Sequence, residues 1–173
     1  MITDLVEIRS LTKGREAESL QFRRYVRNHH RDEESFRIIA REVEAQIDCT
    51  QCANCCRQTV VEVSDLEIAR IAGYLRMEPA EVIRLYTTTE DPDARGTRVL
   101  MNRSNGCTFL DGNLCLVYEA RPEACRGFPH LVSGKRSLGS RMTSIYQRAS
   151  YCPIVYNTLE AYKHLIGYHP RPH

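Results

Sequence analysis

The sequence predicts a small α+β fold in which an irregular centre lies between two helical segments. Residues 1–48 contain no cysteine and space their apolar residues like an α-helix. Residues 49–156 hold all the cysteine and most of the turn signals, and residues 157–173 return to helical spacing. The chain has 173 residues, of which 42% are hydrophobic, which suits one ordinary domain with a modest core. We therefore expect one compact domain built from these three segments.

The N-terminal segment is predicted to contain an amphipathic helix. Its apolar residues recur at positions i, i+3, i+4, i+7 and i+11, on one face of a helix: Phe36, Ile39, Ala40, Val43 and Ile47. A polar cluster at residues 28–34 indicates a break before this helix. The apolar face can pack on the centre of the domain, or it can bind a protein partner or a second copy of the chain.

The first part of the centre is predicted to be scaffold. Residues 58–63 alternate with β-branched side chains, which predicts a short strand. Ser64 and Glu67 have the spacing of a capping box, which marks the start of a helix. We expect the buried face of that helix to hold Ile68, Ile71, Ala72 and Leu75. A second helix is expected to begin at Pro79, with three apolar contacts: Val82, Ile83 and Tyr86.

Further along, the pattern predicts a loop at residues 87–96, a strand at 98–101 and then a hairpin. The turn signal Asp-Gly-Asn at residues 111–113 stands between two apolar runs. We expect this hairpin to bring Cys107 and Cys115 near each other across its base.

The chain then becomes irregular before it returns to helix. Prolines and glycine in residues 119–129 predict a tightly turned segment, and Gly134–Lys135 marks a further turn. A short amphipathic helix is predicted from about Asn157, followed by a frayed tail from Tyr168. The apolar face of this helix holds Leu159, Tyr162 and Ile166.

Eight cysteines provide the strongest chemical signal in the sequence. They are Cys49, Cys52, Cys55, Cys56, Cys107, Cys115, Cys125 and Cys152. The first four form a C-x2-C-x2-C-C run, which places several soft ligands within reach of one ion. Clustering of this kind argues against eight buried cysteines that act only as small hydrophobic residues.

The N-terminus bears on the oxidation state of these thiols. It lacks a basic start followed by an apolar run, so no secretory signal is expected, and no stretch has the apolar length needed to cross a bilayer. We therefore expect a cytoplasmic protein without a membrane partner, whose cysteines bind metal or take part in redox chemistry. A disulfide framework remains the alternative for a chain that has lost its leader.

The predicted cofactor is zinc or iron, the latter including an iron-sulfur cluster. All eight cysteines are candidate ligands, and thiolates favour these metals over calcium, magnesium or manganese. Adjacent side chains point in different directions, so Cys55 and Cys56 are expected to serve two neighbouring sites, unless one of them only packs. Eight thiols divide into two four-cysteine zinc sites, or four hold one iron-sulfur cluster and four remain. In either case we expect metal to organise the centre of the fold.

The formal charge of +2 is a weak guide to partners. Two divalent ions on eight thiolates would lower it to −2. Residues 121–148 carry six Lys or Arg and one Glu, but no recognisable motif for reading grooves or stacking bases. A solvated basic hairpin is expected there, and a nucleic-acid partner is not favoured.

The order of the cysteine blocks also carries a resemblance. The blocks are Cys49-x2-Cys52-x2-Cys55-Cys56-Arg57, Val63-Ser64-Asp65-Leu66, Cys107-x-Phe109-Leu110, Cys115-x-Val117-Tyr118-Glu119-x-Arg121-Pro122-x2-Cys125-Arg126-x-Phe128-Pro129 and Cys152-Pro153. Residues 49–153 thereby resemble the CxxCxxCC family, also called the YkgJ-type cysteine-cluster family or the "putative zinc- or iron-chelating domain". The resemblance implies metal chelation by the cysteines, and no assigned reaction.

Two functions follow as hypotheses. The first is a metal-binding module whose ions hold the fold together and which serves as an accessory or interaction protein. The second is a metalloenzyme in which an iron-sulfur cluster or an open metal position supports redox or methyl-transfer chemistry. Some flagellin lysine N-methylases resemble this chain in their cysteine module, but no glycine-rich strand-to-helix turn indicates a separate S-adenosylmethionine domain. The catalytic residues of such an enzyme are unknown.

Overall fold

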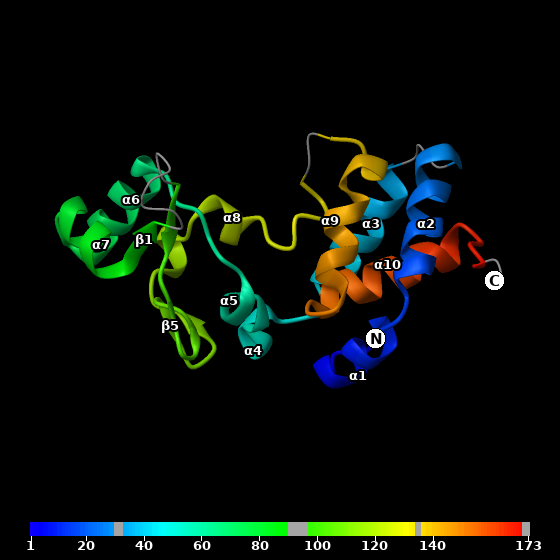
Figure 1. Cartoon of the computed structure of the whole chain (residues 1–173), viewed down its shortest axis with the longest axis horizontal. Coiled ribbons are helices and arrows are strands. Elements are labelled where there is room, and N and C mark those ends of the chain that lie inside the picture. The colour runs from blue at the N-terminus through cyan, green and yellow to red at the C-terminus, as the bar shows by residue number, and fades with distance from the viewer. Residues whose placement is uncertain (30–32, 90–96, 134–135, 171–173) are drawn as a thin grey trace. The chain divides into compact units, whose positions relative to one another are not determined.

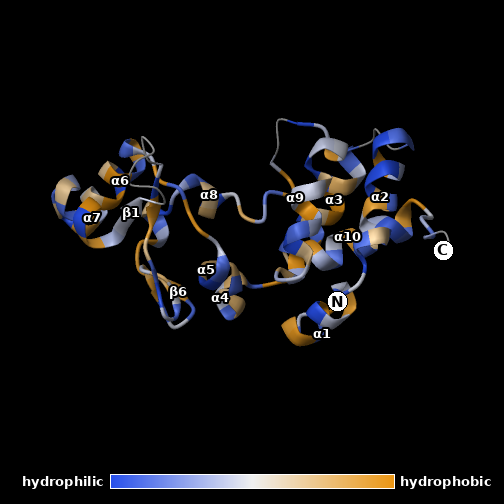
Figure 2. Cartoon of the chain, viewed as in Figure 1, coloured by the Kyte–Doolittle hydropathy of each residue, from blue (hydrophilic) through white to orange (hydrophobic). Residues whose placement is uncertain are grey.

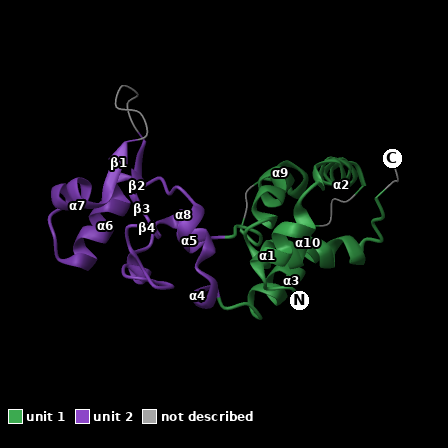
Figure 3. Cartoon of the chain, turned by 60° about the horizontal axis from the view of Figure 1, so that its bottom comes forward, with its two compact units in different colours: residues 1–48, 129–173 green, residues 49–128 purple. Residues whose placement is uncertain are grey.

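A computed structural model describes residues 1–29, 33–89, 97–133 and 136–170. Its contacts divide the chain into two compact units: a helical unit of residues 1–48 and 129–173, and a cysteine unit of residues 49–128 (Figure 3). Helices occur in both units, and short antiparallel hairpins occur in the cysteine unit, so the predicted α+β class is confirmed (Figure 1). The three predicted segments, with boundaries at residues 48 and 156, stay a prediction.

The helical unit is built from α1 (Leu5–Thr12), α2 (Glu16–His29), α3 (Glu33–Glu44), α9 (Leu138–Ala149) and α10 (Pro153–Leu165). Helix α10 packs against α3 and α9, and α2 packs against α9. An aromatic cluster fills the core: Phe22 meets Tyr146, Tyr162 and Tyr168 edge to face, and Phe36 meets Tyr162 in the same way. Such rings bury large apolar areas and stabilise the packing of the helices.

The predicted N-terminal helix is α3, and its apolar face is the expected one. Phe36, Ala40 and Val43 are buried, as the spacing predicts. The helix ends at Glu44, so Ile47 lies beyond it and does not extend this face. The predicted break falls on residues 30–32, which lie outside the described chain, between His29 of α2 and Glu33 of α3.

The C-terminal half of the helical unit departs from expectation. Residues 138–149 form helix α9, so the predicted basic hairpin was wrong. Its four buried residues recur at helical spacing: Leu138, Met142, Ile145 and Ala149. Helix α10 begins at Pro153, earlier than predicted, because proline suits the first turn. The turn expected at residues 134–135 and the last three residues of the predicted tail lie outside the described chain.

The cysteine unit is made of short elements. Its helices are α4 (Cys49–Cys52), α5 (Asn54–Gln58), α6 (Asp65–Leu75), α7 (Pro79–Tyr86), η1 (Tyr118–Ala120) and α8 (Glu123–Arg126). Its strands pair as three antiparallel hairpins: β1 (Thr87–Thr89) with β2 (Arg98–Leu100), β3 (Asn102–Arg103) with β4 (Gly106–Cys107), and β5 (Leu110–Asp111) with β6 (Leu114–Cys115). In Figure 2 apolar and polar colours alternate along α6 and α7, as expected of helices with one buried face.

The scaffold of this unit follows the predicted pattern closely. The capping box of Ser64 and Glu67 is present at the start of α6. Ile68, Ile71 and Ala72 are buried in a small core with Val82 of α7, and Leu75, Ile83 and Tyr86 pack against that core. The expected hairpin at residues 111–113 is the β5–β6 pair.

Two predictions about strands need correction. Residues 58–63 do not form a strand, because Gln58 belongs to α5. Only residues 61–63 pair with β2, through a Val63 N–H to Arg98 oxygen bond of 2.9 Å and a Leu100 N–H to Val61 oxygen bond of 2.8 Å. The loop predicted at 87–96 begins with strand β1, whose Thr87 pairs with Leu100, and residues 90–96 lie outside the described chain.

No helix within the described ranges combines the length and the apolar character needed to cross a bilayer.

Candidate metal centre

A sharp turn between α4 and α5 positions the first cysteines. Ala53 joins the two helices in the left-handed conformation, with φ 47° and ψ 17°. The Ala53 N–H closes α4 by donating to the Cys49 carbonyl at 2.9 Å. A left-handed residue redirects the backbone abruptly. Cys49 and the adjacent pair Cys55 and Cys56 can therefore approach the same cavity from two successive helices.

Arg57 and Asn113 connect these helices to the β5–β6 hairpin. The Arg57 guanidinium donates to the Cys52 carbonyl at 3.1 Å, to the Gly112 carbonyl at 2.7 Å and to Asn113 Oδ1 at 2.7 Å. Asn113 Nδ2 in turn donates to the Gln51 carbonyl at 3.0 Å. The three bonds to and from the hairpin span more than fifty residues of sequence, and they hold the C-x2-C-x2-C-C run against the hairpin that carries Cys115.

Gly106 allows strand β4 to lie directly against α5. Its φ of +118° is disfavoured for other residues, and a Cβ atom there would stand 2.6 Å from Arg57 Cα and 2.7 Å from the Cys56 carbonyl oxygen. The next residue in the chain is Cys107. Glycine at position 106 thus brings Cys107 next to the segment that carries Cys56.

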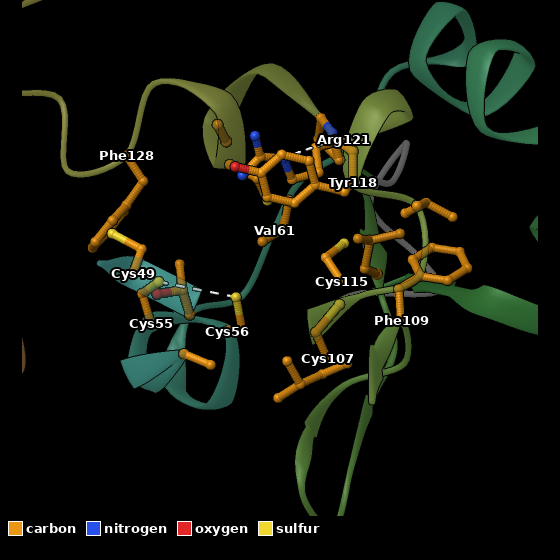
Figure 4. Close-up of a pocket in the computed structure, with 18 of the residues that line it drawn as sticks. Cys49, Cys55, Cys56, Val61, Cys107, Phe109, Cys115, Tyr118, Arg121 and Phe128 are labelled. Atoms are coloured by element: carbon orange, nitrogen blue, oxygen red, sulfur yellow. Dashed lines mark hydrogen bonds between the residues drawn. The ribbon is translucent and has the colours of Figure 1, made fainter. Parts of the chain in front are cut away.

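These contacts surround a cavity of about 280 Å³ within the cysteine unit (Figure 4). Six thiol-bearing residues line it: Cys49, Cys55, Cys56, Cys107, Cys115 and Cys125. They come from α4, α5, β4, β6 and α8. The expected proximity of Cys107 and Cys115 is confirmed at this cavity, although Cys115 pairs in register with Leu110.

Cys56 has a thiol that is more acidic than an ordinary cysteine. A contact with Cys55, with the two Sγ atoms 4.0 Å apart, and the positive charges of Arg121 and Arg57 lower the pKa of Cys56 to about 7, although burial opposes the change. A thiol with this pKa is about half thiolate at neutral pH. Cys56 is therefore more ready to bind a cation than Cys107, Cys115 or Cys125, whose pKa values are raised.

Three of the other thiols at the cavity have pKa values shifted the opposite way. Burial raises the pKa of Cys107 and Cys115, and it raises that of Cys125 to about 12. Negative charge on neighbouring thiols adds to these increases: Cys56 acts on all three, and Cys107 and Cys115 both act on Cys125. The four sulfur atoms are thus close enough to repel one another as thiolates. A cation among them would relieve both the burial cost and the repulsion.

Three arginines beside the cysteines act mainly through backbone oxygens. Besides the bonds of Arg57, Arg121 Nε donates to the Tyr118 carbonyl at 2.8 Å, and Arg126 donates to the carbonyls of Arg121 and Glu119. The Arg121 guanidinium also lies over the Tyr118 ring, 3.5 Å from its centroid. These contacts fix the turned segment before Cys125, while the Arg121 charge lowers the pKa of nearby thiols.

The structure does not bring all eight cysteines to this cavity. Cys52 is half-buried on α4 but is not part of the lining, and Cys152 is buried in the helical unit at the start of α10. Within the described residues, no three His, Cys, Asp or Glu side chains already form a group that could hold a metal ion. The assignment of all eight as ligands stays a prediction. The donor set at the cavity is nevertheless purely thiol, which suits zinc or iron.

The far wall of the cavity was not apparent from sequence. Apolar and aromatic residues continue the lining beyond the sulfur atoms, including Val61, Phe109, Tyr118 and Phe128 (Figure 4). They come from separate segments of the chain, and each reads locally as an ordinary core or turn residue. No spacing rule connects them, so only the folded structure reveals this wall.

Comparison with known proteins agrees with this donor set. A model of the CxxCxxCC family, described as "Putative zinc- or iron-chelating domain", matches residues 48–153, which is more than half of the chain. No curated protein and no solved structure matches the chain.

Proposed function

Since the chain belongs to the CxxCxxCC family, we propose that it is a cytoplasmic metal-binding protein whose thiolates hold zinc or iron. The observation that carries this proposal is the cavity onto which six thiol-bearing residues from five short elements converge. A unit with such short elements gains little stability from its own core, and a bound ion supplies what the core lacks. The metal therefore has a structural role, and the protein acts as an accessory or interaction module.

The first metal site in this proposal consists of Cys56, Cys107, Cys115 and Cys125. These four lie at one cavity, where Cys56 raises the pKa of the other three and Cys107 and Cys115 raise that of Cys125. Four thiolates around one ion are the arrangement of closed structural zinc sites and of iron-sulfur clusters. Cys49 and Cys55 line the same cavity and are proposed as ligands of a neighbouring site. Ligation by Cys52 and Cys152, and partner binding by the N-terminal helices, stay predictions.

A cytoplasmic location is part of the same proposal. The eight cysteines are present as thiols, the form that a reducing compartment maintains and that metal binding needs.

Cysteine variants test the proposed ligand set. Cys125→Ser should lower the metal content of the purified protein and its thermal stability together, because serine is a poor ligand for a soft ion. Cys52→Ser is the matched comparison, since Cys52 lies close in sequence to the cluster but outside the cavity lining. Metal content, measured by elemental analysis, should fall less in Cys52→Ser. Full metal content in Cys125→Ser would exclude this residue as a ligand, and equal losses would extend the ligand set beyond the cavity.

Catalysis at the same centre is a second candidate function, favoured by the apolar wall and by the arginines that line the cavity. A catalytic metal keeps an open position that faces a pocket, whereas a structural one is closed by protein ligands. Cobalt substitution distinguishes the two. A visible spectrum that changes on addition of a small thiol or of cyanide would indicate an open position, and an unchanged tetrathiolate spectrum would support the structural module.

A further inference from the structure

A second cavity lies entirely within the helical unit and contains no cysteine. Its volume is about 430 Å³, within the usual range for sites that bind small molecules. The lining comes from the end of α1, the first half of α2, the second half of α9 and the middle of α10. Most of the lining residues carry a hydroxyl group or a charge, and these groups can bind the polar part of a ligand.

A buried, fully paired cation stands at one side of the cavity. Lys163 is 7% exposed, and its Nζ donates to Glu18 and to Glu160, each at 2.7 Å. The ammonium also lies 5.4 Å from the centre of the Tyr146 ring. Two carboxylates offset the cost of burying one ammonium, so Lys163 is already satisfied by the protein. Its role is to fix the positions of Glu160 and Tyr146 in the lining.

The Tyr146 hydroxyl is not satisfied in this way. Its oxygen is buried close to the Lys163 ammonium, which can only donate, so the hydroxyl proton has no acceptor among the described residues. An unpaired buried hydroxyl destabilises a fold, and buried tyrosine hydroxyls usually find a partner. Tyr146 lines the cavity, so a ligand there can accept the missing hydrogen bond.

Two guanidinium groups complete the donor set. Arg15 is 39% exposed, and it reaches Glu18 and Glu160 only at 3.9 Å, the outer limit of an ion pair. Arg23 lines the cavity and makes no hydrogen bond or ion pair with another described residue. The lining also holds the carboxylates of Glu16 and Glu160. Lys163 pairs with Glu160, so the charged groups left to a ligand are the guanidinium groups of Arg15 and Arg23 and the carboxylate of Glu16, which together carry a net positive charge.

We propose that this cavity binds a small metabolite through an oxyanion, either a phosphate or a carboxylate. Planar guanidinium groups match the geometry of both oxyanions, and the Tyr146 hydroxyl supplies a third donor. The cavity is larger than one oxyanion needs, and its other hydroxyl-bearing residues can receive the rest of a polar ligand. This site is independent of the metal centre, because the two cavities share no residue.

Calorimetric titration of the full-length protein tests the proposal, with glycerol 3-phosphate as the phosphate probe and succinate as the carboxylate probe. We expect saturable binding of one probe, and the probe that binds identifies the oxyanion. Arg23→Gln should weaken that binding about tenfold or more, because it removes a charged donor. Arg24→Gln, a change at the exposed neighbouring position outside the lining, should leave affinity unchanged.

Tyr146→Phe provides a second test that does not alter charge. It should weaken binding while the melting temperature stays nearly the same, because the variant loses a buried hydroxyl whose proton has no acceptor among the described residues. Metal content should be unchanged in all three variants, which separates this site from the metal centre. Absence of saturable binding for both probes, or equal affinities of Arg23→Gln and Arg24→Gln, would overturn the proposal.

Discussion

The helical unit and the cysteine unit reach stability by different means. In the helical unit, helices of eight to fourteen residues bury an aromatic cluster around Phe22. The cysteine unit is built from helices of three to eleven residues and strands of two or three, around a small and mainly aliphatic core. Elements that short are marginal on their own. The cysteine cluster therefore lies in the unit whose apolar core is less able to stabilise its own short elements.

Removal of the metal should have the largest effect, and it should destabilise the cysteine unit far more than the helical unit. Structural zinc contributes on the order of 10 kcal/mol or more of apparent binding free energy. Chelation should therefore unfold residues 49–128, while the helices of the helical unit keep their protection. Hydrogen exchange measured by mass spectrometry, before and after chelation, resolves the two units. Unchanged exchange throughout residues 49–128 would show that metal does not hold this unit together.

Loss of the aromatic core should affect the helical unit in the converse way. Phe22 is fully buried, and truncation of a buried phenylalanine costs about 3–5 kcal/mol. Phe22→Ala should lower the free energy of unfolding by this amount in chemical denaturation, with metal content unaffected. Ile38→Ala, on the exposed side of α3, is the control and should cost less than about 1 kcal/mol. Loss of metal from Phe22→Ala would contradict the view that the aromatic core and the metal stabilise the two units independently.

Gly106→Ala tests whether the close approach of β4 to α5 is needed for the metal centre. The new Cβ would clash with the backbone of Cys56 and Arg57, and the positive φ adds strain of about 1–3 kcal/mol. Melting temperature and metal content should fall together, because β4 can no longer lie against α5. Gly73→Ala is the matched control in the same unit. It lies in α6 with open space around it, so it should stabilise by about 0.5–1 kcal/mol.

The smallest expected effect concerns pH. The pKa of Cys56 is lowered to about 7, chiefly by its contact with Cys55, whereas burial raises that of Cys125 to about 12. A lowered pKa stabilises the fold above the ordinary thiol pKa of 9.0, and this contribution is lost as the pH falls through about 7. In metal-free protein, iodoacetamide should therefore label Cys56 first as the pH rises through neutrality. Labelling of both residues at the same pH would contradict the assigned difference.

Much of the scaffold could be predicted because local chemistry determines it. The capping box at Ser64, the Asp-Gly-Asn turn and the helical spacing around Phe36 each act over a few residues, and each was found where predicted. Helix α9 was not predicted, because the Lys and Arg content of this region was interpreted as a solvated basic hairpin. The spacing of its buried apolar residues is nevertheless helical. The β3–β4 hairpin was missed as well, although Asn105 and Gly106 supply a turn signal.

The candidate site could be predicted only in part. The cysteines were identified as candidate ligands by type and clustering, but their gathering at one cavity depends on contacts far apart in sequence. Arg57 reaches Gly112 and Asn113 across more than fifty residues, and Gly106 approaches the Cys56 backbone. Neither contact has a local signature. The assignment of the adjacent Cys55 and Cys56 to two neighbouring sites stays a prediction. Both residues line the same cavity, because the turn at Ala53 presents α5 to it.

The central claim is that thiolates of the cysteine unit hold a metal that organises it. Elemental analysis of protein purified without oxygen, combined with its visible spectrum, tests this claim most directly. The account predicts at least about one zinc or iron per chain. Colourless protein that contains zinc would identify a zinc-thiolate centre, and brown protein with iron and acid-labile sulfide would identify an iron-sulfur cluster. A folded protein with neither metal, and with residues 49–128 protected from hydrogen exchange, would contradict the account.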